Sequence, residues 1–141
     1  MKYVVDSSVA LKWVLPEADA DKAISIRDNG RNQLDEIHAP DFFTTECGHA
    51  LFRAERRRLI GAGQAEVLLA AIVSDLPLSH SSLTLIPRAS VICQQLGTAF
   101  YDALYMSLAE AEGCVLITAD AKLVRNVQRL YPFVVDLASI S

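Results

Sequence analysis

Residues 99–123 place strong limits on the fold, because they predict a helix, a strand and the start of another helix in direct succession. Apolar residues at helical spacing fill the first half, which predicts a helix with one buried side. Gly113 follows, where a helix commonly ends in a left-handed residue. Residues 114–117 form a short apolar run, as expected of a strand covered on both faces. Such an arrangement is typical of a parallel sheet.

The same alternation continues along the rest of the chain. Strands are predicted at residues 2–5, 36–39, 114–117 and 133–135. Helices are predicted at residues 9–15, 17–28, 41–58, 64–75, 87–96 and 121–130. Residues 83–86 fit either a strand or the lead into the following helix. Alternating strands and helices predict an α/β fold, with a central parallel sheet of four to five strands between two layers of helices.

Length and composition are those of a globular protein. The 141 residues are 52% hydrophobic and 21% charged, which predicts one domain spanning residues 1–141 and excludes a disordered chain. The strongly apolar run at residues 67–73 is too short for a membrane span, so no membrane association is expected. Three cysteines fit neither a disulfide framework nor a CxxC metal pattern, which predicts reduced thiols and a cytoplasmic location.

Four acidic residues interrupt apolar segments. Asp6 ends the first predicted strand and Asp120 follows residues 114–117, so both lie at the carboxyl edge of the sheet, where ligands bind. Asp102 and Glu46 each lie early in a predicted helix and can reach the same edge. Asp102 and Asp120, each taken alone, are more commonly helix caps. Glu46, on or beside an apolar helix face, is harder to explain that way, because an unpaired buried charge is costly.

A shared cleft for these four acids requires a cation. One pair of carboxylates at ~4 Å costs about 4 kcal/mol at an effective dielectric of 20. Oxygen ligands without histidine or cysteine select Mg²⁺, with Mn²⁺ as a plausible substitute. Such sites are typical of phosphodiester hydrolysis. The net charge of −4 counts against a nucleic-acid binder in general, but acids that serve a metal also make a chain acidic.

Four motifs resemble those of the PIN domain, and within it the VapC-type toxins of bacterial toxin–antitoxin pairs. They are YVVDSSVALKW, PDFFTTECGHAL, FYDALYMSLAE and ITADAKL, in family order along nearly the whole chain. The resemblance implies four catalytic acids, Asp6, Glu46, Asp102 and Asp120. It implies that Asp6 and Asp102 bind the metal directly, and that Ser8 and Thr118 are supporting hydroxyls. His49 departs from the pattern, because many relatives carry asparagine there.

The resemblance also implies an activity and partners. It predicts a magnesium-dependent ribonuclease that acts as a toxin, forms a homodimer and is inhibited by a cognate VapB-like antitoxin. Basic residues near the motifs are candidates for contacts with RNA phosphates: Lys12, Arg53, Lys122 and Arg125. The principal alternative is a catalytically silent PIN-like module that binds RNA or a partner, against which the presence of all four acids argues.

Three other classes of α/β protein fit the sequence less well. A phosphoacceptor receiver domain requires adjacent acids after the first strand, whereas two serines follow Asp6. A haloacid-dehalogenase-type phosphatase requires a second aspartate at position 8, which is Ser8. A nucleotide-binding module requires a glycine-rich loop after the first strand, and the segment DSSVALKW contains no glycine.

Overall fold

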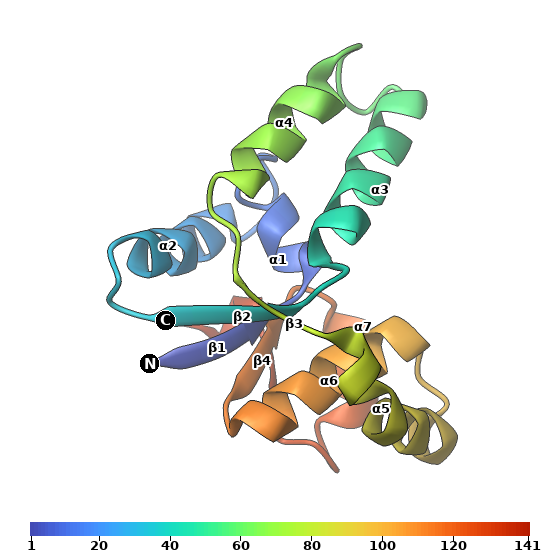
Figure 1. Ribbon diagram of the computed structural model, residues 1–141. Helices are drawn as coiled ribbons and strands as arrows, with labels where there is room; N and C mark the ends of the chain where they lie inside the picture. Colours follow the sequence, from blue (N-terminus) through green and yellow to red (C-terminus); the bar gives the residue numbers. More distant parts are fainter.

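The computed structural model describes residues 1–141 and is built on a five-stranded, fully parallel sheet in the order β3-β2-β1-β4-β5 (Figure 1). Val4 pairs with His38 on one side and with Leu116 on the other, so β1 lies at the centre. The strands are β1 (Lys2–Val5), β2 (Glu36–Pro40), β3 (Leu78–His80), β4 (Val115–Thr118) and β5 (Val134–Asp136).

Seven α-helices surround the sheet and complete the predicted three-layer α/β/α architecture. In Figure 1, α1 to α4 lie on one side of the sheet and α5 and α6 on the other. The helices are α1 (Ser7–Leu11), α2 (Ala20–Arg31), α3 (Phe43–Arg56), α4 (Gln64–Val73), α5 (Ser82–Leu96), α6 (Phe100–Glu112) and α7 (Ala121–Val127), and a short 3-10 helix, Leu137–Ser139, ends the chain. None of them has the length and hydropathy needed to cross a membrane.

The core lies on both faces of the central strands. Val4 and Val5 of β1 and Leu116 of β4 are completely buried, as a central parallel strand requires. Helix α6 is buried at every position from residue 103 to 109, because it lies directly against β1, β2 and β4 and is itself covered by α5. This helix therefore has a fixed position relative to the strand ends.

The first helix begins earlier than predicted. The helix predicted at residues 9–15 is α1, Ser7–Leu11. The reason is that Asp6 itself is the N-cap, with its side chain accepting a hydrogen bond from the Val9 amide.

Strand β3 was not predicted, and the strand interpretation of residues 83–86 is wrong. Those residues belong to α5, which begins at Ser82, more than one turn before Pro87. Pro87 lies in the second turn on the exposed side of the helix, where it removes one intrahelical hydrogen bond. Strand β3 has only three residues and lies at the sheet edge, so it lacks the apolar pattern of the central strands.

Helices α3 and α4 form a hairpin that projects away from the sheet (Figure 1). Because α4 packs mainly on α3, only Ala65 and Ile72 of α4 are fully buried. Val67, in the apolar run at residues 67–73, is 66% exposed. The hairpin thus carries Glu46 on an element that is partly separate from the sheet layers.

Candidate active site

Asp6 lies at the carboxyl end of β1 and is almost completely buried. Its Oδ1 accepts hydrogen bonds from the Ser8 hydroxyl and, at 3.4 Å, from the Val9 amide. Burial raises the pKa of Asp6 to about 6, and the negative charges of Glu46 and Asp102 act in the same direction. The hydroxyl groups around it oppose this effect only in part. The ionised form of Asp6 is therefore destabilised in the folded protein at neutral pH.

Two hydroxyl side chains join the ends of β1 and β4. Ser8 Oγ accepts a hydrogen bond from the Ala119 amide at 2.9 Å and lies 3.4 Å from Thr118 Oγ1. Thr118 Oγ1 in turn accepts from the Asp120 amide at 3.1 Å. This network connects the loop that carries Asp6 to the loop that carries Asp120.

Asp120 begins α7 directly after β4. Its Oδ1 accepts a hydrogen bond from the Leu123 amide at 3.1 Å, so Asp120 is the N-cap of α7. The residue is exposed at the sheet edge. Capping fixes one oxygen of the carboxylate and leaves the other available to a ligand.

Asp102 lies in the first turn of α6, but it does not cap that helix. The N-cap is Ala99, which makes no side-chain bond. Burial is the largest cause that raises the pKa of Asp102 to about 6, and repulsion from the Asp120 and Glu46 carboxylates acts in the same direction. No hydrogen bond opposes these effects. Asp102 is therefore a half-buried anion without a donor from the protein.

Glu46 reaches the same region from the first turn of α3. The hydroxyl of the buried Tyr105 donates to Glu46 Oε1 at 2.9 Å. Burial and the Glu46 charge both raise the pKa of Tyr105, so the hydroxyl keeps its proton and remains a donor. The neighbouring Cys47 is an inert thiol, because burial raises its pKa to about 12.

Tyr105 is a site residue that the sequence interpretation missed. It was hidden in the long buried run of α6, where an aromatic residue is ordinarily part of the core. Its position three residues after Asp102 places both on one side of the helix, and this spacing is the signal that could have found it.

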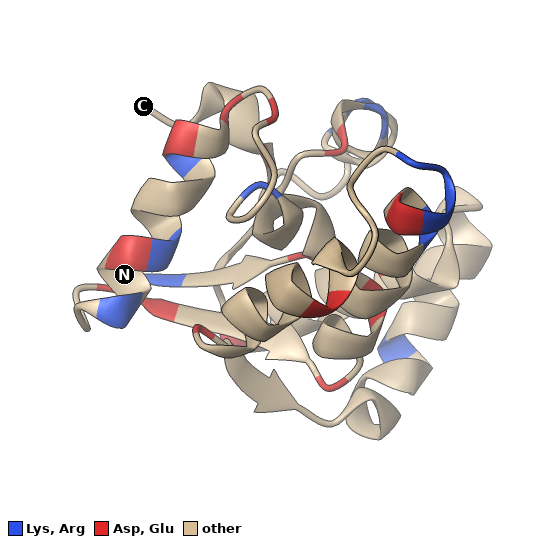
Figure 2. Cartoon of the chain, turned by 90° about the horizontal axis from the view of Figure 1, so that it is seen from above, with Lys and Arg blue, Asp and Glu red and all other residues tan.

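The structure brings the four predicted acids together. The charges of Glu46 and Asp102 help to raise the pKa of Asp6, and the charges of Asp120 and Glu46 help to raise the pKa of Asp102. No three of them have ligand atoms all within 4.8 Å of one another, as mutual repulsion predicts. Figure 2 shows acidic segments of several elements near the middle of the view, while most basic residues lie at the periphery. A donor set of carboxylates alone, destabilised by burial and repulsion, fits a hard divalent cation.

The predicted basic residues lie in different surroundings. Lys12 is mostly buried and its Nζ lies 3.8 Å from Glu17 Oε1, so it already has an anionic partner. Arg53 is exposed on α3, seven residues after Glu46 and therefore on the same side of the helix. It lines a shallow hollow together with His49 and Arg57. Lys122 and Arg125 are exposed on α7.

Comparison with known proteins places this arrangement in a family. The PIN domain profile matches residues 3–129. Ribonuclease VapC3 of Pyrobaculum aerophilum is 28% identical over 132 residues, which cover 92% of this chain and 98% of the relative. Ribonuclease VapC9 of Mycobacterium tuberculosis is 30% identical over 132 residues, covering 94% and 96%.

Solved structures share the fold. The crystal structure of PAE2754 from Pyrobaculum aerophilum superposes with a TM-score of 0.71 at 23% identity, covering 99% of this chain and 94% of the other. VapBC2 from Rickettsia felis, bound to a DNA fragment from its promoter, gives a TM-score of 0.64 at 15% identity, covering 96% and 97%. With the family profile spanning nearly the whole sequence, the chain belongs to the PIN domain family and is similar within it to the VapC ribonucleases.

Proposed function

We propose that the protein is a divalent-cation-dependent ribonuclease of the VapC type. The observation that carries this proposal is the convergence of four carboxylates from four elements at the carboxyl edge of the sheet, two of them with pKa values raised to about 6. The similarity to proteins named VapC ribonucleases supports RNA as the substrate.

Each acid has a distinct part in the proposed site. Asp6 and Asp102 bind the cation, Mg²⁺ or Mn²⁺, which supplies positive charge to stabilise the phosphoryl group during hydrolysis. Asp120 completes the acidic pocket and is held by its cap on α7. The Tyr105 hydroxyl fixes Glu46 Oε1, so Glu46 Oε2 is free to accept a hydrogen bond from the attacking water.

RNA hydrolysis should depend on the cation. The purified protein is expected to cleave RNA in the presence of Mg²⁺ or Mn²⁺, to stop when EDTA is added, and to recover when the cation is restored. Product formation on a labelled RNA measures this. Cleavage at an undiminished rate in EDTA would contradict the proposed site.

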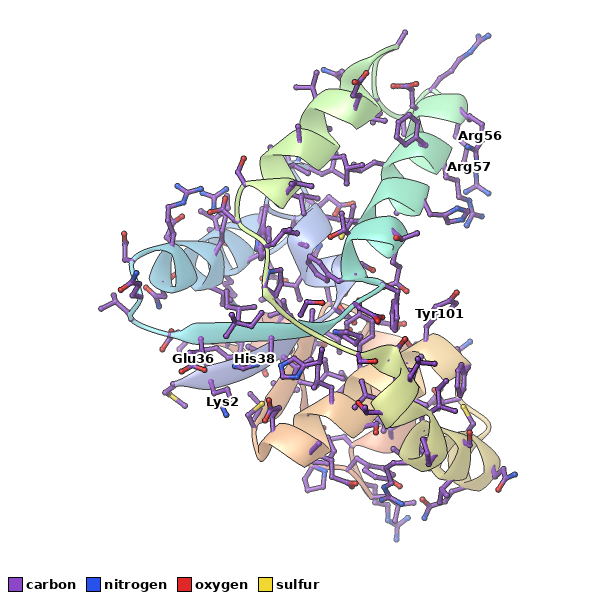
Figure 3. All side chains as sticks on the ribbon, in the orientation of Figure 1. Lys2, Glu36, His38, Arg56, Arg57 and Tyr101 are labelled. Atoms are coloured by element: carbon purple, nitrogen blue, oxygen red, sulfur yellow. The ribbon has the colours of Figure 1, made fainter.

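The RNA backbone is proposed to follow α3 outward from the acids. His49, Arg53 and Arg57 line one hollow on this helix, and neither arginine has an ion-pair partner. Figure 3 shows Arg57 and Arg56 projecting from the far end of α3. An unpaired arginine beside a nuclease site fits a phosphate contact.

Replacing Arg53 should weaken RNA binding without stopping catalysis. Arg53→Ala is expected to raise KM and to reduce the slope of log Kd against log salt by about 1, because one phosphate contact is lost. Arg129→Ala is the matched control, since Arg129 is also exposed and lies outside α3. An equal effect of both substitutions would show a general charge effect and contradict a contact by Arg53.

We also propose that the enzyme is the toxin of a toxin–antitoxin pair in the cytoplasm, that it forms a homodimer, and that a VapB-like antitoxin inhibits it. The similarity to the VapC ribonucleases supports this role. Co-expression with the short protein encoded by the neighbouring reading frame should yield a complex with reduced RNA cleavage. Cleavage by that complex at the full rate would contradict inhibition.

A further inference from the structure

A second group of potential ligands lies away from the acidic site. His38 Nδ1 and His80 Nε2 are 2.7 Å apart, and Glu112 Oε1 lies 3.7 Å from the first and 3.4 Å from the second. Two aromatic nitrogens and one carboxylate oxygen thus lie within 4.8 Å of one another. This group and the four acids share no residue.

The three side chains come from three different elements. His38 is in β2, His80 ends the edge strand β3, and Glu112 is the last residue of α6. Asp102, at the other end of α6, is ten residues away, or about 15 Å along the helix axis. The histidine group is therefore spatially separate from the acidic site.

The environment of His38 prepares one nitrogen for a ligand. Its ring is buried, and Nε2 lies 2.9 Å from Glu36 Oε1 (Figure 3). A carboxylate can only accept, so the proton of a neutral His38 ring lies on Nε2 and Nδ1 carries a free electron pair. A carboxylate that holds the outer nitrogen of a histidine is the usual support for a metal-binding ring.

The spacing fits a tetrahedral ion. Ligand atoms about 2.0–2.1 Å from a tetrahedral Zn²⁺ are about 3.3 Å apart. The two distances from Glu112 Oε1, 3.4 and 3.7 Å, are close to this value, and the ring nitrogens at 2.7 Å need to separate by about 0.6 Å. His80 is at the sheet edge and only half-buried, so its side chain has room to make this movement.

The charges around the group are compatible with a dication. Glu112 and Glu36 supply two negative charges, and Lys2 Nζ lies 3.8 Å from the other Glu112 oxygen, Oε2. Two imidazoles and a carboxylate are borderline ligands that favour zinc over magnesium.

We propose that His38, His80 and Glu112 form a zinc-binding site, with Glu36 as a positioning residue and a water molecule as the fourth ligand. Bound zinc would join the edge strand β3 to β2 and to the end of α6. When zinc binds, the proton of the neutral His80 ring moves from Nε2 to Nδ1, and the electron pair freed on Nε2 binds the ion.

Zinc titration of the full-length protein, without added tag histidines, tests this proposal. Calorimetry in excess Mg²⁺, which fills the proposed acidic site, should give one equivalent of bound zinc, and Co²⁺ should give the visible absorption of a tetrahedral complex. His80→Asn and Glu112→Gln should each lower zinc affinity by at least about tenfold, and Glu36→Gln by about 10- to 100-fold.

His49→Asn is the matched control, because His49 is the third histidine of the chain and lies outside the group. It should leave zinc affinity unchanged. The Asp6→Asn/Asp102→Asn double variant should also bind one equivalent, which separates this proposal from that of the nuclease site. Circular dichroism in EDTA checks that each variant folds, and His80→Asn is tolerated most easily because of its edge position.

Three results would overturn the proposal: no zinc binding by the wild type, unchanged affinity in both His80→Asn and Glu112→Gln, or loss of zinc binding only in the double aspartate variant. The last result would assign the zinc to the acidic site. Binding lost in the histidine and glutamate variants and kept in His49→Asn would establish the site.

Discussion

Asp102→Asn is expected to lower the rate of RNA cleavage by roughly 100- to 1,000-fold or more while leaving the fold intact. Asp102 caps no helix, and no hydrogen bond from the protein opposes the rise in its pKa, so its removal breaks no internal contact. Asparagine has the same shape but lacks the charge that a divalent cation requires. Initial cleavage rates at saturating Mg²⁺, with thermal melts of both proteins, measure the two effects.

Asp21→Asn is the matched control for this experiment. Asp21 is an exposed acid in the first turn of α2, so the substitution makes the same charge change away from the site. It should leave cleavage unchanged. Cleavage that survives in Asp102→Asn at the wild-type rate would show that the activity belongs to a contaminating nuclease or to a different site.

Asp6→Asn is expected to stabilise the protein in EDTA at pH 7. The rise of the Asp6 pKa from 3.8 to about 6 corresponds to on the order of 3 kcal/mol of lost stability when the carboxyl is ionised. Asparagine retains an oxygen that can accept from Ser8 and Val9, so the cap of α1 is preserved. The melting temperature should rise by about 5–10 °C.

The pH dependence of this difference follows from the direction of the shift. A carboxyl whose pKa is raised on folding holds its proton more tightly in the folded state, so the wild type loses stability as pH rises from about 4 to about 6. Asp6→Asn lacks that ionisation. The two proteins should therefore differ little below pH 4 and most above pH 6, as measured by chemical denaturation across this range.

Mg²⁺ provides the second arm of the same experiment. A cation bound by Asp6 should raise the melting temperature of the wild type and leave that of Asp6→Asn nearly unchanged. The higher melting temperature of Asp6→Asn relative to the wild type should then shrink or reverse. A variant less stable than the wild type in EDTA at pH 7 would show that Asp6 contributes more through its hydrogen bonds than it loses through burial and repulsion.

The sheet and the acids could be predicted from the sequence because each leaves a local signal. Central parallel strands are continuous apolar runs, and an acid directly after such a run lies at the carboxyl edge. Asp6 and Asp120 were assigned in this way. Asp120 is also the helix cap that its sequence position indicated, whereas the cap role of Asp6 was not predicted. Glu46 was recognised because an ionised residue on an apolar face needs a partner. The hydroxyl of Tyr105, which donates a hydrogen bond to Glu46, is one such partner.

The histidine group could not be predicted, because its members are brought together by tertiary structure alone. His38 and His80 are 42 residues apart and meet only through the parallel pairing of β2 with β3. Strand β3 is three residues long and has no apolar pattern, so its pairing leaves no trace in the sequence. Glu112 lies at the end of a helix, where a charged residue is ordinarily solvated.

The order of strands in the sheet has a consequence for the newly made chain. Asp6 is synthesised long before β4, but Ser8, which supports it, bonds to Ala119 across 111 residues of sequence. A protein emerging from the ribosome offers β1 only β2 as a neighbour until β4 has left the exit tunnel. A chain that has not yet extended past β4 therefore lacks both the Ser8–Ala119 hydrogen bond and the Asp120 carboxylate, and the acidic site first assembles once residues 115–120 have left the exit tunnel.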